Sequence, residues 1–176
     1  MVDGKPRDYK SKESVPDELL GEYIPTAECT DHQFSGTFNG QAANLHFWDT
    51  PCIDGWTDEE TRAQEAKRAE VYRRADFVLL CFSICSPTSL ANVQKKWCPE
   101  LQRHTPESRV LLLGMKTEFR EDWETKEALR KMGMVPTTYQ DGEQVAREID
   151  AVQYLECTVI DRESVVRVLE TIIRLV

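Results

Sequence analysis

Continuous apolar runs alternate with segments of helical apolar period along the second half of the chain, and no other feature of the sequence constrains the fold as strongly. The runs cover residues 77–84 and 110–113, with a shorter stretch around residues 154–160. Apolar runs of this length fit strands that are buried on both faces. Because helical segments separate the strands, the sequence predicts an α/β fold with a mostly parallel sheet covered by helices.

Three segments have the apolar spacing of helices, at i, i+3, i+4 and i+7. Their apolar stripes are Leu90, Val93, Trp97 and Leu101; Val145 and Ile149; and Val165, Leu169, Ile172, Ile173 and Val176. Ser86 and Pro87 predict the start of the first helix, because serine can cap a helix and proline suits its first turn. Pro99 predicts a kink near the end of the same helix.

A hairpin is predicted in the first half of the chain. Residues 34–38 and 44–48 fit two strands. Asn39 and Gly40 lie between them, and both residue types tolerate a positive φ at a tight turn.

A helix is predicted after the hairpin. Residues 57–60 read TDEE, which has the spacing of a capping box, so the helix should begin there and end near Arg74. Its inner stripe holds only small residues, Ala63, Ala66 and Ala69. We therefore expect this helix to lie on the surface and to pack weakly.

Size and charge restrict the function classes. The 176 residues suit one compact domain, with residues 1–18 as a flexible lead-in and residues 19–176 as the domain. No apolar run approaches the roughly 20 residues of a membrane span, so we expect a soluble protein. A formal charge of −9 argues against nucleic-acid binding, which depends on basic surfaces.

The cysteines carry no assigned chemistry. Six are present, without a CxxC pair and without a secretory leader, so neither a zinc site nor a disulfide framework is predicted. A reducing cytoplasm fits best. Cys81 and Cys157 lie in apolar runs, where a free cysteine behaves as a small buried hydrophobe.

Several strings resemble the Rho/Rac-type small GTPases of the Ras superfamily. Residues 21–26, GEYIPT, are similar to the first switch of that family, and residues 45–50, LHFWDT, to the strand that leads into the second switch. Residues 80–83, LCFS, and 96–100, KWCPE, resemble its core strand and following helix. The resemblance covers residues 20–176 in the correct order and implies a three-layer G domain of the P-loop NTPase type.

Two further strings strengthen the resemblance. The segment from residues 119–122, FRED, to residues 136–139, PTTY, looks like the insert helix of Rho proteins, and residues 154–158, YLECT, match the guanine-side strand. The resemblance implies signal transduction, including control of the actin cytoskeleton, with Rho-type regulators or effectors as partners. The family cofactor is GTP or GDP with Mg²⁺, and the family activity is GTP hydrolysis.

The phosphate loop of the family is missing from this sequence. It reads GxxxxGK followed by Ser or Thr, and its backbone amides cradle the phosphates; here only residues 3–6, DGKP, resemble it. The loss of two or three charge-assisted bonds removes on the order of 4 to 8 kcal/mol, or roughly three to six decades of affinity. We expect weak or absent nucleotide binding.

The metal and hydrolysis positions are altered as well. The resemblance places Thr26 and Asp49 at the Mg²⁺ positions, but one hydroxyl and one carboxylate do not make an octahedral site, so no metal is expected. In the second switch, residues 49–53 read DTPCI where the family has Asp-x-x-Gly-Gln. Pro51 stiffens the turn, and Ile53 cannot orient a water molecule. We therefore assign no catalytic residue and expect hydrolysis to be lost.

The guanine side is better preserved. The family motif Asn/Thr-Lys-x-Asp becomes residues 115–118, MKTE, so the resemblance assigns base contacts to Lys116 and to Glu118, whose arm is longer. Thr158 and Val159 replace a Ser-Ala pair whose backbone amide contacts the base. Together with Thr26 and Asp49, these residues form a vestigial guanine-nucleotide site; a merely inherited loop remains the alternative.

Partner-binding residues are expected at the first switch and on the following hairpin. Tyr23, Ile24 and Pro25 belong to the partner-facing loop, and Trp48 occupies a position that helps to select exchange factors in the family. For Trp48, burial for packing is the alternative. His32, His46 and His104 have no regular spacing and are interpreted as surface residues.

The first, central strand of the family has no counterpart near the start of this sequence. The strands at residues 44–48 and 77–84 must then pair directly, gain a strand from another molecule, or leave free edges that permit self-association. We predict a five-stranded mixed sheet of marginal stability.

Two functional hypotheses follow. One is a pseudo-GTPase that acts as a protein-binding module; the other is a truncated isoform or incomplete gene model of a conventional GTP-hydrolysing protein. The internal changes from Pro51 to Ile53 and at Glu118 favour the first. The sequence also ends without the CaaX cysteine of prenylated proteins, so no stable membrane anchor is expected.

Overall fold

A parallel three-stranded sheet lies at the centre of the protein. The computed structural model describes residues 26–38, 41–52 and 57–175. Its sheet order is β3-β4-β5, with all neighbours parallel, and the strands are β3 (Phe77–Ser83), β4 (Arg109–Met115) and β5 (Gln153–Cys157). The predicted α/β fold with its parallel strands is confirmed, although β5 ends three residues earlier than the apolar run.

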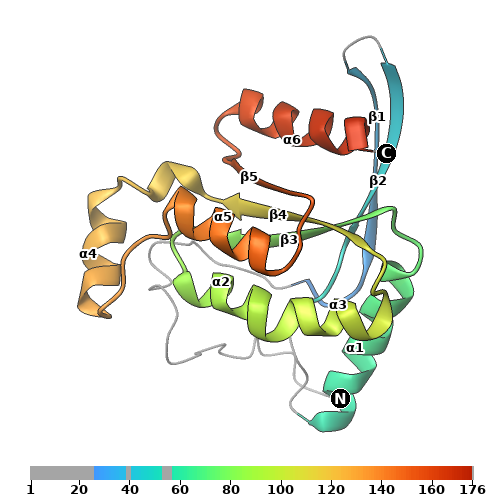
Figure 1. Ribbon diagram of the computed structural model, residues 1–176, viewed down its shortest axis with the longest axis horizontal. Helices are drawn as coiled ribbons and strands as arrows, with labels where there is room; N and C mark the ends of the chain where they lie inside the picture. Colours follow the sequence, from blue (N-terminus) through green and yellow to red (C-terminus); the bar gives the residue numbers. More distant parts are fainter. Residues whose placement is uncertain (1–25, 39–40, 53–56, 176) are drawn as a thin grey trace, which may run out of the picture.

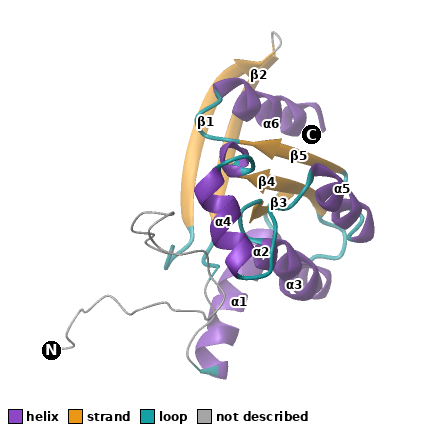
Figure 2. Ribbon diagram, turned by 90° about the vertical axis from the view of Figure 1, so that its left-hand side faces the viewer, coloured by secondary structure: helices purple, strands orange, loops and turns teal. Residues whose placement is uncertain are grey.

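Helices cover both faces of this sheet, which gives three layers (Figures 1 and 2). One face carries α2 (Pro87–Asn92), the π-helix η2 (Val93–Trp97), α3 (Cys98–His104) and α5 (Tyr139–Glu148). The other face carries α6 (Arg162–Leu175). Each face has its own apolar core: Phe82, Ile84 and Val93 lie in the first, and Leu111, Val168 and Ile172 in the second.

The helix that was predicted to begin at Ser86 and to kink at Pro99 consists of three pieces. Ser86 is the N-cap residue and Pro87 occupies the first turn, but the Ser86 side chain makes no capping hydrogen bond within the described part of the chain. Instead, the hydroxyl of Ser89 donates to the Ser86 carbonyl over 2.6 Å. The widened turn of η2 comes directly before Pro99, which lies in the first turn of α3, where its missing N–H costs least.

The predicted hairpin is present, and its strands are longer than the sequence pattern indicated. β1 (Thr30–Phe38) pairs antiparallel with β2 (Gln41–Asp49). The turn residues Asn39 and Gly40 lie outside the described residues. Figure 1 shows the hairpin at one end of the molecule, beside α6.

The prediction of one five-stranded mixed sheet is wrong, because the five strands form two separate sheets. β2 and β3 do not pair. Side chains connect the two sheets instead: Leu45 and Phe47 of β2 pack on the core beneath α6, and the guanidinium of Arg74 lies 5.2 Å from the ring centre of Trp48. Residues from the end of α1 and from α6 line a cavity between β2 and β3.

The helix after the hairpin, α1 (Asp58–Tyr72), begins as the capping box predicted. Thr57 is the N-cap residue; its hydroxyl accepts from the amide of Glu60, and the Glu60 carboxylate accepts from the Thr57 amide. The prediction of weak packing is wrong. Ala63 and Ala66 are exposed, whereas Arg68, Ala69 and Tyr72 are buried, so the last turns of α1 pack firmly against the protein.

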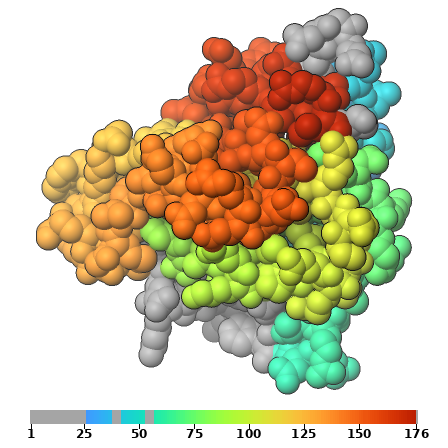
Figure 3. All heavy atoms as spheres, in the orientation of Figure 1, coloured from blue at the N-terminus to red at the C-terminus, as the bar shows by residue number. Residues whose placement is uncertain are grey.

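The predicted insert helix is present as α4 (Trp123–Lys131), with Asp122 as its N-cap residue. The short 3-10 helix η3 (Thr117–Phe119) precedes it. Figures 1 and 3 show α4 at the end of the molecule opposite the hairpin.

Two smaller findings concern the cysteines and the helices. Cys157 is buried as predicted, but Cys81 is exposed; its side chain lies on the α6 face of β3, whose free edge has no strand partner among the described residues. None of the helices in residues 26–38, 41–52 and 57–175 has the length and apolar character that a bilayer crossing requires.

Gly142 gives a test of the packing between α5 and β5. A Cβ atom at this position would lie 2.2 Å from Cζ and 2.4 Å from the hydroxyl of Tyr154. Because this ring is half of a stacked pair with Phe82, Gly142→Ala should destabilise the protein by about 1–3 kcal/mol in urea unfolding. Helix propensity alone predicts a gain of about 1 kcal/mol, so a stabilised variant would contradict the close contact.

Candidate functional site

The loops at the carboxyl ends of β4 and β5 bring the predicted base-side residues together. In the register of these parallel strands, Met115 lies opposite Cys157. Lys116 and Thr158 follow directly, so the two loops begin side by side at one edge of the sheet. In open α/β sheets, ligands bind at this edge.

Lys116 has a backbone conformation that is rare for a residue with a side chain. Its φ is 65° and its ψ is 40°, in the left-handed region, which costs roughly 1–2 kcal/mol. Two contacts to its carbonyl oxygen hold the turn: the amide of Phe119 donates over 3.2 Å, and the Cys85 thiol donates over 3.8 Å. Such strain accumulates where a loop serves a function.

Glu118 has a carboxylate oxygen that is buried and unsatisfied. Its Oε2 atom has almost no exposed surface and finds no hydrogen-bond partner among the described residues. A buried acceptor without a donor is destabilising by about 1–3 kcal/mol. The oxygen therefore offers an acceptor to a ligand that carries N–H groups.

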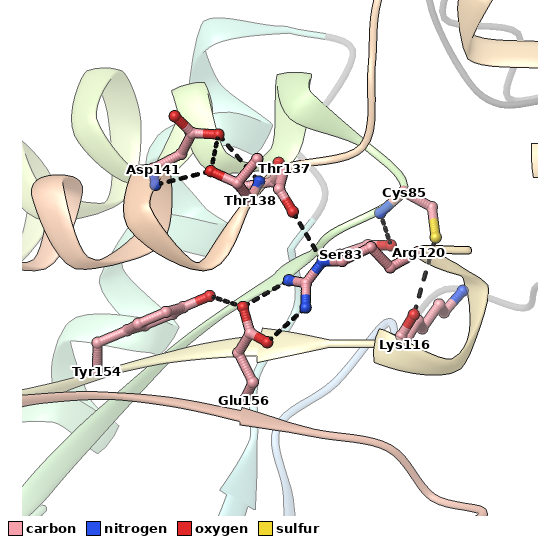
Figure 4. Close-up of polar contacts among 9 residues, drawn as sticks. All are labelled: Ser83, Cys85, Lys116, Arg120, Thr137, Thr138, Asp141, Tyr154 and Glu156. Carbon is pink, nitrogen blue, oxygen red and sulfur yellow. Dashed lines mark hydrogen bonds and ion pairs between the residues drawn. The ribbon is translucent and has the colours of Figure 1, made fainter. Parts of the chain in front are cut away.

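Arg120 connects the Lys116 loop to β5 and to the segment after α4 (Figure 4). Its guanidinium donates two parallel hydrogen bonds to Glu156, over 2.6 and 2.8 Å, and its Nε donates to the carbonyl of Thr137 over 3.2 Å. The hydrogen bond to Glu156 raises the pKa of Arg120. The Tyr154 hydroxyl also donates to Glu156, over 2.6 Å. Burial is the larger cause that raises the pKa of Tyr154, and the neighbouring Glu156 carboxylate raises it further.

The loop after β5 is held by the first turn of α6. The Ser164 hydroxyl accepts from the amide of Thr158 over 3.2 Å and donates to the carbonyl of Asp161 over 2.7 Å. Thr158 is buried, whereas Val159 and Ile160 are 77% and 76% exposed. The exposed pair thus projects from a fixed loop beside Lys116.

The structure joins Thr26 and Asp49 to each other. The Thr26 hydroxyl donates to Oδ2 of Asp49 over 2.6 Å, at the carboxyl end of β2. No described hydrogen bond or ion pair connects these two residues with the base-side loops. Within residues 26–38, 41–52 and 57–175, no group of three or more His, Cys, Asp or Glu side chains is arranged to hold a metal. One hydroxyl and one carboxylate provide two of the roughly six oxygen ligands of Mg²⁺.

A buried ion pair fixes the segment that follows β2. Arg68 of α1 donates to both carboxylate oxygens of Glu100, each over 2.7 Å, and to the carbonyl of Pro51 over 3.2 Å. Both charged side chains are at most 3% exposed, and Pro51 is fully buried. The Tyr72 hydroxyl donates to Glu100 over 2.9 Å; burial and this carboxylate raise the pKa of Tyr72.

Sequence reasoning missed Arg68, Glu100, Arg120 and Glu156. A usable signal existed for the first pair. Arg68 precedes Ala69 on the buried stripe of α1, and Glu100 lies three residues after Trp97 on a stripe of apolar residues. Opposite charges on the inner stripes of two neighbouring helices indicate a buried pair. For Arg120 and Glu156 the sequence gives no such signal, because their segments meet only in the folded chain.

The partner-facing residues divide between described and undescribed parts of the chain. Tyr23, Ile24 and Pro25 lie outside the described residues. Trp48 is 37% exposed on β2, and its role in partner binding stays a prediction. Two of the three histidines contact carboxylates: His46 lies 3.3 Å from Asp31, and His104 lies 2.8 Å from Glu65.

The residues that the resemblance assigns to the base side, Lys116 and Glu118, lie in one turn after β4. Thr26 and Asp49, the two residues that the resemblance places at the Mg²⁺ positions, are hydrogen-bonded to each other.

The fold belongs to the class of α/β proteins whose parallel strands carry the site at their carboxyl ends. The model of the Ras family matches residues 14–176. Two Rho-related proteins are similar to this chain. The chain belongs to the Ras family of small GTPases, and within it to the Rho/Rac type.

The two relatives extend well beyond the matched region. The Rho-related protein racI of Dictyostelium discoideum is 33% identical over 140 residues, which are 78% of this chain and 64% of the relative. The Rho-related GTP-binding protein RhoD of Homo sapiens is 34% identical over 119 residues, which are 68% of this chain and 53% of the relative. The chain thus spans between about half and two thirds of the length of these relatives.

The buried pair can be tested by breaking it and by replacing it. Glu100→Ala leaves the charge of Arg68 buried and unpaired, so the free energy of unfolding should fall by about 3–5 kcal/mol. A variant with Arg68→Met, Tyr72→Phe and Glu100→Leu removes the polar groups together and should recover most of this loss in urea unfolding. A combined variant that is as unstable as Glu100→Ala would show that the charges themselves stabilise the protein.

Proposed function

We propose that this Rho-type protein acts as a protein-binding module with little or no GTP hydrolysis, a pseudo-GTPase. Its partners are Rho-type regulators or effectors, and Trp48 contributes to their contact surface together with Tyr23, Ile24 and Pro25. The proposal rests on the second-switch segment, where residues 49–53 lack the glycine and glutamine that the family uses for hydrolysis.

The observation that carries the proposal is the fixed position of Pro51. A nucleotide-sensing segment must change conformation when the γ-phosphate leaves. Here the proline is fully buried, and its carbonyl accepts from Arg68, whose other donors are engaged with Glu100. Such a segment favours one conformation, which suits a constant binding surface better than a switch.

A second candidate function is that of a conventional GTPase of which this chain is one part. The retained base-side geometry favours it: Lys116 is strained, and the buried oxygen of Glu118 is unsatisfied. The printed name of the human relative includes GTP binding. An additional segment would have to supply the phosphate loop, and Pro51 to Ile53 would have to be compatible with hydrolysis.

Nucleotide content separates the two candidates. The purified full chain is denatured, and the supernatant is analysed for guanine nucleotide; in parallel, the native protein is titrated with a fluorescent GDP analogue and assayed for GTP hydrolysis. We expect no stoichiometric nucleotide, a Kd that is micromolar or weaker, and no hydrolysis above the buffer rate. Stoichiometric GDP or GTP, or measurable turnover, would overturn the first candidate.

Partner binding tests the other half of the proposal. Trp48→Ala should weaken the binding of a Rho-type exchange-factor domain about tenfold or more in calorimetry, because exposed tryptophans often dominate interfaces. Trp123→Ala is the matched control, since Trp123 is 73% exposed at the opposite end of the molecule. Equal affinities for both variants and the unmodified protein would remove Trp48 from the contact surface.

Base recognition has its own test at Glu118. If the chain binds guanine nucleotide, Glu118→Ala should lower the affinity for the fluorescent GDP analogue roughly 10- to 150-fold, the equivalent of about 1.5–3 kcal/mol for a hydrogen bond to a charged group. Glu124→Ala, an exposed carboxylate on α4, should leave the affinity unchanged. An unchanged affinity in Glu118→Ala would show that its unpaired oxygen does not meet the base.

A further inference from the structure

The segment that comes directly before β1 is attached by its side chains to two distant parts of the chain. The Thr26 hydroxyl donates to Oδ2 of Asp49, the last residue of β2, over 2.6 Å. The Lys67 ammonium of α1 donates to both carboxylate oxygens of Glu28, over 2.9 and 2.8 Å. We name residues 26–29 the strap, because these two contacts fasten it to β2 and to α1.

Helix α1 also holds the segment that follows β2. Arg68, the next residue after Lys67, donates to the carbonyl of Pro51 over 3.2 Å. Two successive residues of α1 therefore bind the two chain segments at the base of the hairpin, one segment each. The Thr26 hydrogen bond joins these segments to each other. The strap, residues 49–51 and α1 thus form a closed triangle of contacts.

The contact between the strap and α1 is weaker than the contact between Pro51 and α1. The side chains of Lys67 and Glu28 are 42% and 72% exposed, and exposed ion pairs contribute little stability. Arg68, by contrast, is buried in the ion pair that anchors α1. The strap is therefore the part of the triangle that opens most easily, while Pro51 stays attached to α1.

The strap carries one of the two residues that the resemblance places at the Mg²⁺ positions. Here the hydroxyl of that residue, Thr26, donates directly to the carboxylate of the other, Asp49. The Lys67 ammonium supplies a positive charge to the strap at Glu28. Side chains of the described residues thus connect the strap to the second-switch segment without help from a ligand.

We propose that α1 and Asp49 hold the strap, residues 26–29, closed without nucleotide, so that the partner-binding surface keeps a constant shape. In the sequence the strap directly follows Tyr23, Ile24 and Pro25, which the proposed function assigns to that surface. The strap thus gives the proposed function, on which this inference rests, a means of fixing the surface that needs no nucleotide. Closure of the strap itself is measured without a partner.

Cys29 provides a chemical reporter inside the strap. Its side chain is half-buried, and burial is the largest cause that raises the pKa of its thiol, followed by the neighbouring Glu28 carboxylate. The positive charges of Lys67 and Arg68 lower the pKa of this thiol. Because the thiolate is the form that reacts with iodoacetamide, alkylation of Cys29 should become faster when the strap opens and the thiol meets solvent.

Two variants release the strap in different ways. Thr26→Val removes the hydroxyl at nearly constant size, and Lys67→Met removes the ammonium but keeps an apolar stem. In the full chain, with EDTA and without nucleotide, we expect iodoacetamide to alkylate Cys29 about threefold faster or more in each variant, as mass spectrometry of the Cys29 peptide measures. Lys126→Met, which breaks an exposed ion pair with Glu121 elsewhere in the protein, is the matched control and should leave the rate unchanged.

The direction of the change separates opening of the strap from a purely electrostatic effect. If the strap does not move, Lys67→Met only removes a charge that lowers the pKa of Cys29, and alkylation becomes slower. A slower rate in Lys67→Met, or an unchanged rate in Thr26→Val, would therefore overturn the proposal. Equal acceleration at the buried Cys157 would overturn it as well, because the variants would then loosen the whole fold.

The alkylation rates are independent of the tests of the proposed function. They involve neither guanine nucleotide nor a partner, so a strap that proves open leaves those measurements as they stand. Conversely, stoichiometric nucleotide in the purified chain would overturn the pseudo-GTPase proposal, while the rates in EDTA would still decide whether the strap is closed.

Discussion

The ion pair between Arg68 and Glu100 holds three separate parts of the chain in one place. It joins the last turns of α1 to α3, and through the carbonyl of Pro51 it also fixes the segment that leaves the hairpin. Burying two charges is costly, and attraction between them rarely offsets the whole desolvation penalty. Here the Tyr72 hydroxyl and the Pro51 carbonyl satisfy further polar groups, and the Trp97 ring lies 5.2 Å from the guanidinium. The pair therefore specifies how α1 docks more than it adds to stability.

A second network gives order to the opposite end of the molecule. Arg120 bonds to Glu156 and to the Thr137 carbonyl, so it links the Lys116 loop, β5 and the segment that returns from α4. The Ser164 hydroxyl closes the Thr158 loop in a similar way. These contacts come entirely from the protein, so the base-side loops are organised by the chain's own side chains. Oε2 of Glu118 has no hydrogen-bond partner among the described residues, which is also true of Oε1 of Gln64 and the hydroxyl of Thr105 elsewhere in the protein.

Local patterns predicted the elements well where the signal lies within a few residues. The capping box at Thr57 gave the start of α1, and the turn residues between two strand-like runs gave the hairpin. The stripes from Leu90 to Leu101 gave a helical segment, and Pro99 marked its irregularity. Predictions that required distant contacts did worse. α1 was expected to pack weakly because its alanines are small, but its buried face is built from Arg68 and Tyr72, whose partner lies on another helix.

The pairing of the strands also could not be predicted from local sequence patterns. The apolar runs and the hairpin pattern predicted the strands, but only the folded chain shows that β2 and β3 do not pair and that residues of α1 and α6 line the cavity between them. Cys81 was expected to be buried because it lies in an apolar run, yet it is exposed on β3. For the site, the resemblance identified Lys116, Glu118, Thr158 and Val159. It gave no indication of Arg120 or Glu156, which hold the loops.

The sequence by itself indicated the family, the order of the elements and the departure of residues 49–53 from the family's second-switch motif, because these are written in short strings and local periods. Only the tertiary structure decided that the described strands form two sheets, that α1 is anchored by a buried charge pair, and that a cavity lies between β2 and β3. The physical reason is that pairing, burial and the satisfaction of polar groups depend on partners far away in the chain. A local pattern fixes which face of an element is apolar, but it does not fix what that face will meet.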